Sequence, residues 1–496
     1  MNNLLLVAPW LSTVFSVIVA ILILLATITI HEFGHYIVGK LLKFKINEFA
    51  IGLGPAIYKK VKKNGEIFSI RLFPLGGFCA FEGEDEDDET IKKKNQKATE
   101  VYEKDYPDKK QTEPPKKKEL SKDAFNNKKP WERILVLIAG ASFNFVVAVI
   151  IVIITFVGYG HFALTAGETI PPQNQTEQSL SLEQGDILVK IDGKFLYFAT
   201  DIVSMLDGKN ENDVVTVTVK RNGKMVDQQV SLRASVEASN MADTDVCFKA
   251  LGVASVLYVK GDDDSDSVLK DGTYIYRFKE SGKEYRDCQR VYTAEDLYER
   301  LKLLSPNETL TVYIPDKNSQ SGEKLEYTFT APQNFNTIDI NNQTAVLKAF
   351  GIEATQLSYQ VGTESVKFGF FENIGRGFVY SLKTVPVTLA SFWQLITGNL
   401  PLNSVSGPIG TITMTSQMVS LGFKYILNIA SLIGLSVAIF NLLPIPALDG
   451  ARAVFVIIEW IRKKPINRNV EGIIHFVGLI VLVVFALLID ALKLFI

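Results

Sequence analysis

Four long apolar runs constrain this chain more than any other feature. They carry no Asp, Glu, Lys or Arg and cover residues 11–30, 134–158, 425–443 and 473–489. A helix needs about 20 mostly apolar residues to cross a bilayer. We therefore expect a polytopic α-helical membrane protein, with spanning segments in residues 1–44, 131–160, 424–450 and 470–496. The alternative, a soluble enzyme with buried helices, does not need runs of this length.

A signal peptide is the rival interpretation of the first run. A positively charged start and a small-residue cleavage site are both typical of signal peptides. Residues 1–10 carry no positive charge, and no such cleavage site precedes His31. We therefore expect this run to be retained as a spanning helix.

Basic residues flank the apolar runs in three clusters. The clusters are Lys40, Lys43 and Lys45; Lys128, Lys129 and Arg133; and Arg462, Lys463, Lys464 and Arg468. Lys and Arg near span ends favour the cytoplasmic side. All three clusters fall on that side if both termini lie outside the cell. The region 160–420 is then outside as well.

The segment 83–130 has a different composition. It opens with an acidic block and continues with scattered lysines. Such a segment cannot bury enough apolar surface to fold alone. We expect a mobile cytoplasmic insert, either a solvated linker or a regulatory tether.

Residues 165–360 have the short strands and turns of aqueous α+β domains. An alternating stretch around Asn222-Gly223 predicts a β-hairpin. A weaker copy of the pattern follows: ATDI at 199–202 is matched by AEDL at 294–297, and Leu251-Gly252-Val253 by Phe350-Gly351-Ile352. We predict two tandem units. The first, 165–256, resembles a PDZ domain, and the second, 257–360, a diverged PDZ. One domain with a long β insertion is the alternative.

The chain has three cysteines, too few for a disulfide framework. Cys247 and Cys288 share the outer region. They either pair or remain free thiols.

The motif that carries chemistry ends the first apolar run. His31-Glu32-Phe33-Gly34-His35 fits His-Glu-x-x-His. Positions i and i+4 share one face of a helix, so both imidazoles can reach one metal ion. The glutamate between them can take a proton from water. Ionisable residues inside a spanning helix are expensive and are usually functional.

A catalytic zinc site usually has three protein ligands. The best candidate for the third is Asp449, which follows the prolines Pro444 and Pro446 at the end of the third run. The charge-derived topology places this end on the same side of the membrane as His31. The prolines should break the helix there. We therefore predict that His31, His35 and Asp449 hold one zinc ion, with Glu32 as the general base.

Several motifs together resemble the site-2 protease family, in its bacterial subgroup with extracytoplasmic PDZ domains. They are HEFGH at 31–35, NLLPIPALDG at 441–450, GLGP at 52–55, PLGG at 74–77, SGPIG at 406–410, and Gly140 with Asn144. The resemblance implies an intramembrane zinc metalloprotease of the bacterial plasma membrane. Its substrates would be transmembrane proteins already trimmed outside, such as anti-sigma factors and remnant signal peptides. The sequence departs from the family at Gly140-Ala141, where Gly-Pro is common, and in its longer charged insert.

The resemblance also suggests roles for less distinctive segments. Residues 45–82 should form a membrane-associated β-hairpin beside the active site, whose edge could hold an unwound substrate by strand addition. Residues 361–423 should be an amphipathic, interfacial region that contains the SGPIG motif. Asn144 and Asn441 either contact the substrate or make interhelical hydrogen bonds. By the charge-derived topology, His161 and His475 should lie away from the motif, as an outer interfacial residue and a buried helix residue respectively.

Expected partners are membrane-protein substrates and the lipid bilayer, with peptide or substrate contacts through the PDZ-like domains and no nucleic acid. The rival from another class is an inactive membrane scaffold, but a scaffold has no need of Glu32. A transporter is a third class. It is disfavoured because the four spans show no repeated membrane half.

Overall fold

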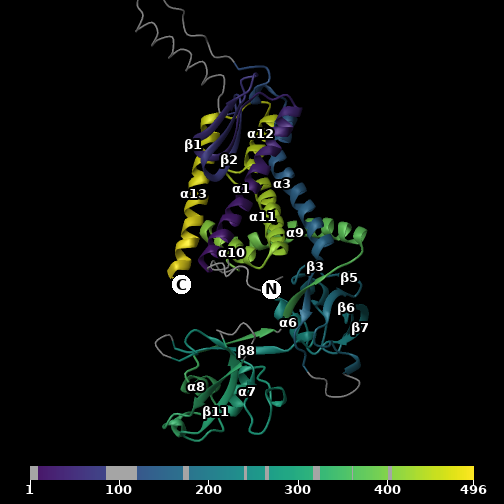
Figure 1. Cartoon of the computed structure of the whole chain (residues 1–496), viewed down its shortest axis with the longest axis vertical. Helices are drawn as coiled ribbons and strands as arrows, with labels where there is room; N and C mark the ends of the chain where they lie inside the picture. Colours follow the sequence, from purple (N-terminus) through teal and green to yellow (C-terminus); the bar gives the residue numbers. More distant parts are fainter. Residues whose placement is uncertain are drawn as a thin grey trace, which may run out of the picture. The chain divides into compact units, whose positions relative to one another are not determined.

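The computed structural model describes residues 9–84, 120–170, 178–238, 243–262, 267–316, 324–359, 361–399 and 405–495. The chain divides into two compact units (Figure 1). The first unit combines Met1–Gly160 with Lys367–Ile496, and the second is His161–Val366.

The first unit is mainly helical. Its helices are α1 (Pro9–Leu41), α3 (Pro130–Tyr159), α9 (Phe370–Ile396), α10 (Pro408–Ser420), α11 (Phe423–Leu442), α12 (Asp449–Arg462) and α13 (Arg468–Phe495). Helix α3 packs against α1, α9, α11 and α12. Within the described residues, four helices are long and apolar enough to cross a membrane: Thr13–Leu41, Pro130–Tyr159, Phe423–Leu442 and Arg468–Leu492. The prediction of a polytopic membrane protein is confirmed.

The third predicted segment, 424–450, is not one helix. Helix α11 ends at Leu442, and the chain turns through the next six residues before α12 begins at Asp449. Pro444 and Pro446 cause the break, because proline lacks the N–H that a helix needs and its ring clashes with the preceding turn. Ala447 has a positive φ of 80° in this turn. The sequence prediction did not include α12 as a separate helix.

Strands β1 (Ile46–Val61) and β2 (Ile67–Phe81) form an antiparallel pair with an irregular register. Residues from Phe49 to Ile51 each have two partners: Phe49, for example, pairs with both Phe68 and Cys79. The last part of β1 returns to pair with the start of β2, as Val61 does with Ile67. The two strands therefore fold over into a small sheet of four segments, and the segment from Gly77 to Phe81 pairs with the first half of β1.

Most of the predicted charged insert lies outside the described residues, but its last part is packed. A short 3-10 turn, Phe125–Asn127, precedes α3. The Phe125 ring is 4% exposed and belongs to a core that also contains Phe44, Phe81 and Val456. The packed part of the chain therefore begins before residue 130, where the mobile insert was predicted to end.

The second unit holds two modules with separate hydrophobic cores. The first module has a six-stranded sheet in the order β14-β3-β4-β6-β7, with β5 paired to β4. Its elements are β3 (His161–Ala166), β4 (Ile187–Ile191), β5 (Lys194–Phe195), α5 (Asp201–Leu206), β6 (Val214–Arg221), β7 (Lys224–Ser231), α6 (Thr244–Ala250) and β14 (Val361–Val366). Alternate residues of β6, from Val215 to Val219, are fully buried, as one face of a half-buried strand requires.

The second module has two three-stranded sheets, β10-β11-β12 and β13-β8-β9. Its elements are β8 (Ser255–Lys260), β9 (Thr273–Ile275), β10 (Arg277–Phe278), the 3-10 turns Tyr285–Asp287 and Phe335–Thr337, α7 (Ala294–Leu301), β11 (Thr309–Pro315), β12 (Lys324–Thr330), α8 (Gln343–Ala349) and β13 (Ala354–Tyr359). Cys288 of this module and Cys247 of the first are both free thiols.

The two modules repeat local details. The Asp201 carboxylate accepts the Tyr197 backbone N–H at 2.8 Å, and Asp296 accepts that of Tyr292 at 2.9 Å. Gly252 and Gly351 each follow a short helix with the same positive φ of 75°. These are the positions that the sequence comparison aligned.

The predicted module boundaries need correction. Strand β14 lies in the segment assigned to the interfacial region 361–423, yet it pairs with β3, which begins at His161 rather than at residue 165. The second module is therefore inserted into the first. Local periodicity did not reveal this, because the partner of β14 lies far back in the sequence.

Candidate metal centre

Helix α1 places two imidazoles on one face. His31 and His35 are one turn apart, and their Nε2 atoms lie 3.1 Å from each other. Their ring centroids are 4.8 Å apart. The Nδ1 atom of His35 is 2.8 Å from the Val136 carbonyl oxygen on α3, which fixes its tautomer with Nδ1–H as the donor. The Nε2 atom of His35 then keeps its lone pair, which faces His31.

The first residue of α12 completes the cluster. An Asp449 carboxylate oxygen lies 2.8 Å from His31 Nε2 and 3.2 Å from His35 Nε2. The ligand atoms of the three residues all lie within 4.8 Å of one another. His31 and Asp449 are 418 residues apart in the sequence. The structure therefore brings together the three side chains that the sequence analysis selected.

Glu32 sits on α1 beside the cluster, against the small sheet. The backbone of Cys79 lies near its carboxylate. A methyl group added to Gly77 would lie 3.3 Å from Glu32 Cγ. The segment 77–79 of β2 is thus adjacent to Glu32, which lies between the two histidines and the small sheet.

Gly140 of α3 sets how closely α3 approaches the cluster. A Cβ atom at this position would lie 2.3 Å from His35 Nε2 and 2.8 Å from His31 Nε2. No real Cβ tolerates such distances, so only glycine permits this packing. Sequence reasoning noted Gly140 as part of a family motif but did not assign it to the metal centre.

The two candidate asparagines, Asn144 and Asn441, differ in their hydrogen bonds. The Asn144 side chain is 1% exposed, and neither its Oδ1 nor its Nδ2 has a hydrogen-bond partner among the described residues. It lines a cavity of about 110 Å³ between α1, α3 and α11, together with Thr27 and Gly434. Asn441 instead donates to the Val437 carbonyl of its own helix at 2.9 Å. No described hydrogen bond of Asn441 reaches the cluster.

His475 was expected away from the His-Glu-x-x-His motif, but it contacts the turn before Asp449, the third residue of the cluster. Its Nδ1 atom accepts the Ala447 backbone N–H at 2.9 Å. The histidine of α13 therefore holds the turn that delivers Asp449. Helix periodicity gives the face of a residue but not which loop packs on it, so the sequence could not show this contact. His161 lies in the second unit, where its ring contacts Tyr197.

Comparison with known proteins shows the family to which this chain belongs. The family model "Peptidase family M50" matches residues 19–485. The chain belongs to peptidase family M50. It is similar to the regulator of sigma E protease of Haemophilus influenzae, with 25% identity over 97% of this chain and 98% of the relative. It is also similar to the regulator of sigma-E protease RseP of Escherichia coli (24% identity, 92% and 93% coverage) and to the zinc metalloprotease RasP of Bacillus licheniformis (24% identity, 96% and 97% coverage).

This M50 peptidase is a zinc metalloendopeptidase of the site-2 protease type. It is a multi-pass protein of the bacterial inner membrane. The donor set fits zinc. Two imidazole nitrogens and one carboxylate oxygen are typical ligands, and a tetrahedral ion with bonds of 2.0–2.1 Å spaces its ligand atoms about 3.3 Å apart. The separations seen here, 2.8 to 3.2 Å, are close to that value.

Proposed function

We propose that this peptidase hydrolyses peptide bonds in or near the transmembrane segments of membrane proteins that have already been trimmed outside the cell. His31, His35 and Asp449 are proposed to hold one zinc ion, and Glu32 to act as the general base. The observation that carries the proposal is the convergence of three ligand atoms from α1 and α12 beside a carboxylate on the same helix turn.

The location of the centre supports an intramembrane reaction. His31 and His35 lie inside the candidate span Thr13–Leu41. Leu41 is six residues after His35, which corresponds to about 9 Å along a helix. The centre therefore lies inside the span, a short distance from its C-terminal end and near one membrane surface. We propose that water reaches it from that surface.

The chain's own residues account for most of the chemistry. A zinc ion supplies Lewis-acid polarisation and makes water more acidic. Glu32 takes the proton of the attacking water and then delivers it to the leaving amine. The Val136 carbonyl keeps His35 oriented toward the cluster, and Gly140 allows α3 to pass close to both imidazoles.

The substrate needs an extended backbone, because an intact helix hides its carbonyl groups. The β2 segment 77–79 lies beside Glu32. We propose that this segment aligns the unwound substrate by strand addition. The unpartnered Asn144 carboxamide is proposed as a second contact, for the substrate backbone or its oxyanion, since its two polar atoms have no partner among the described residues.

The orientation is proposed from the basic clusters, with both termini and the second unit outside the cell and the metal centre toward the cytoplasm. The two PDZ-like modules are then on the side where substrates are trimmed. We propose that they act as a size filter. A docking site for a peptide terminus is the competing idea.

Membrane proteomics tests the substrate class. Cells that produce wild-type protein are compared with cells that produce Glu32→Gln. The proposal predicts that membrane stubs without their outer domains accumulate only in the variant. Accumulation of full-length proteins instead, or no change in any membrane protein, would contradict it. A scaffold would behave identically with either residue.

A further inference from the structure

A second cavity, with a charged lining, lies in the first unit between α3, α12 and α13. Its volume is about 540 Å³. The charged residues that line it are Glu84, Arg133, Arg452, Arg468 and Glu471. Neither His31 nor His35 is among its lining residues, so it is separate from the metal centre.

The cavity lies where two spanning helices begin. Arg133 is in the first turn of α3, which starts at Pro130, and Arg468 is the first residue of α13. The ends of spanning helices lie at the level of lipid headgroups. Helix N-termini also carry partial positive charge. Both helices therefore direct their positive ends to this level.

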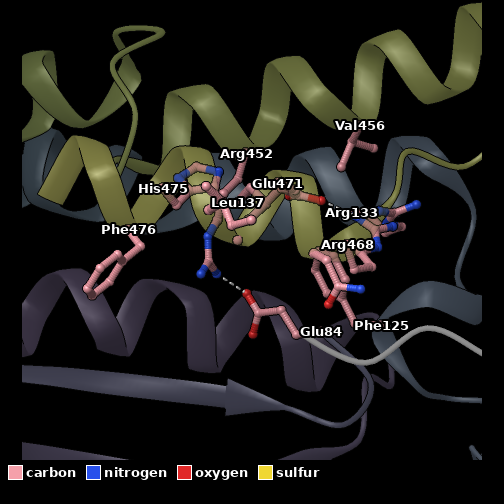
Figure 2. A pocket seen from close by; sticks show the side chains of 13 residues that line it. Glu84, Phe125, Arg133, Leu137, Arg452, Val456, Arg468, Glu471, His475 and Phe476 are labelled. Atoms are coloured by element: carbon pink, nitrogen blue, oxygen red, sulfur yellow. Dashed lines mark hydrogen bonds and ion pairs between the residues drawn. The ribbon is translucent and has the colours of Figure 1, made fainter. Parts of the chain in front are cut away.

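Three carboxylates accompany the three arginines, and one of them, Glu471, is paired with Arg468. Glu459 lies 2.8 Å from Arg133 and 2.9 Å from Arg468. Glu84 pairs with Arg452. Figure 2 shows this last pair within the cavity, with Arg133 and Arg468 at one end and His475 and Phe476 at the other.

Arg133 is the least satisfied of the three. Its side chain is 6% exposed, and its Nε and Nη2 atoms have no hydrogen-bond partner among the described residues. A guanidinium has five N–H donors, and burying unpaired ones is costly. An anion with several acceptor oxygens would satisfy them, and arginine binds phosphate in this way.

We propose that this cavity binds the phosphate of an anionic phospholipid headgroup. The lining holds three arginines against two glutamates, and arginines between spanning helices at headgroup level are suited to such lipids. The lining residues Leu137, Ile473 and Phe476 supply apolar surface for the glycerol and the first acyl carbons. The occupied site would tie α3, α12 and α13 together behind the turn that carries Asp449.

Substitutions of Glu84 and of Arg452 should change lipid binding in opposite directions, and this tests the proposal. The Glu84 carboxylate occupies Arg452 and repels a phosphate in the same cavity. Glu84→Gln should therefore strengthen lipid binding, whereas Arg452→Gln should weaken it. A purely structural ion pair would give the same direction for both variants, because either change breaks it.

The experiment is native mass spectrometry of the full-length protein in detergent, with phosphatidylglycerol or phosphatidylcholine added. Wild type should retain one phosphatidylglycerol in preference to phosphatidylcholine. Arg452→Gln should lower this retention about fivefold, since an interfacial arginine contributes about 1 kcal/mol. The matched control is Arg462→Gln, an exposed arginine at the end of α12. It should change retention less than about twofold, because an exposed charge is screened.

Three results would overturn the proposal: equal retention of both lipids, equal effects of Arg452→Gln and Arg462→Gln, or weaker binding in Glu84→Gln. A further measurement adds inorganic phosphate alone and follows thermal unfolding. Thermal protection by phosphate that Arg452→Gln removes, without any preference for phosphatidylglycerol, would assign the cavity to free phosphate and contradict the lipid assignment. If Arg452→Gln does not fold, the Glu84→Gln result decides.

Discussion

Close approach at Gly140 is the residue-scale feature on which the metal centre depends. The two histidines lie on α1, and the backbone of α3 passes them without space for a single methyl group. The position of each imidazole is therefore set from two sides, by its own helix and by α3.

The first prediction concerns this contact. Gly140→Ala should lower zinc affinity by about 10- to 100-fold, the range seen when groups that orient metal ligands are lost. The new Cβ would otherwise lie 2.3 Å from His35 Nε2, so an imidazole must move. Zinc titration of the purified apoprotein measures the effect.

Gly158→Ala is the matched control, because Gly158 is on the same helix and a Cβ added there would have no atom within 4 Å. It should bind zinc like wild type. Equal zinc affinity in the two variants would show that Gly140 does not shape the centre.

At this scale the sequence predicted which three side chains meet in the cluster, but not what holds them in place. His31, His35 and Asp449 could be selected because their chemistry and the charge-derived topology agree. The contact between His475 and the Ala447 N–H could not, since it depends on how α13 packs on an irregular turn.

At the scale of elements, the small sheet is proposed to align the substrate. Its segment 77–79 lies beside Glu32. The second prediction is that single prolines at residues 77–80 impair cleavage of a model transmembrane substrate while zinc content stays unchanged. Proline removes the N–H that an added strand would use.

Lys63→Pro, in the turn between β1 and β2, is the control for this series and should retain activity. Full activity in every proline variant of the 77–80 series would count against strand addition.

An ion pair between Glu66 and Lys40 connects the turn of the hairpin to α1. Burial raises the pKa of the Glu66 carboxyl, but hydrogen bonds from Lys40, Lys62 and Asn64 outweigh this and hold its pKa at about 2. The unfolded value is about 4.3. A carboxyl whose pKa is lower in the folded state stabilises the fold above the unfolded pKa, and this contribution disappears as the pH falls toward the folded pKa.

The third prediction follows from that shift. Wild type should be more stable than Glu66→Gln above about pH 4.5, and the difference should shrink as the pH falls from 4.5 toward 2. Thermal unfolding in detergent across this range measures it. A difference that is constant with pH would show that the ion pairs do not stabilise the hairpin.

Elements with strong local signals were predictable, and those defined by distant partners were not. The prolines at 444 and 446 indicated the end of α11. The return of β14 to β3, however, is decided by packing against a strand about 200 residues earlier in the chain. Helix α12 was missed because it begins at Asp449, inside the segment 424–450 that was predicted as one span.

At the scale of the whole molecule, the inserted second module offers a clean deletion. Ser255 and Tyr359, at its two ends, are paired neighbours in one sheet. A short linker from residue 254 to residue 361 should therefore leave the six-stranded sheet of the first module intact.

The fourth prediction uses this deletion, together with removal of the whole unit His161–Val366. If the modules form a size filter, either deletion should permit cleavage of untrimmed substrates. Loss of cleavage of trimmed substrates would instead favour a docking role. Cleavage of paired trimmed and untrimmed substrates in membranes distinguishes the two.

The most direct test of the whole account is one variant with two measurements. Glu32→Gln should bind one zinc ion per chain, as we expect of wild type, because the glutamate is not among the proposed ligands. Cleavage of a model transmembrane substrate should fall by about 10²- to 10⁴-fold, the usual contribution of a general base. Cleavage at the wild-type rate with zinc bound would contradict the assignment of Glu32 as the base, and loss of zinc would contradict the ligand set.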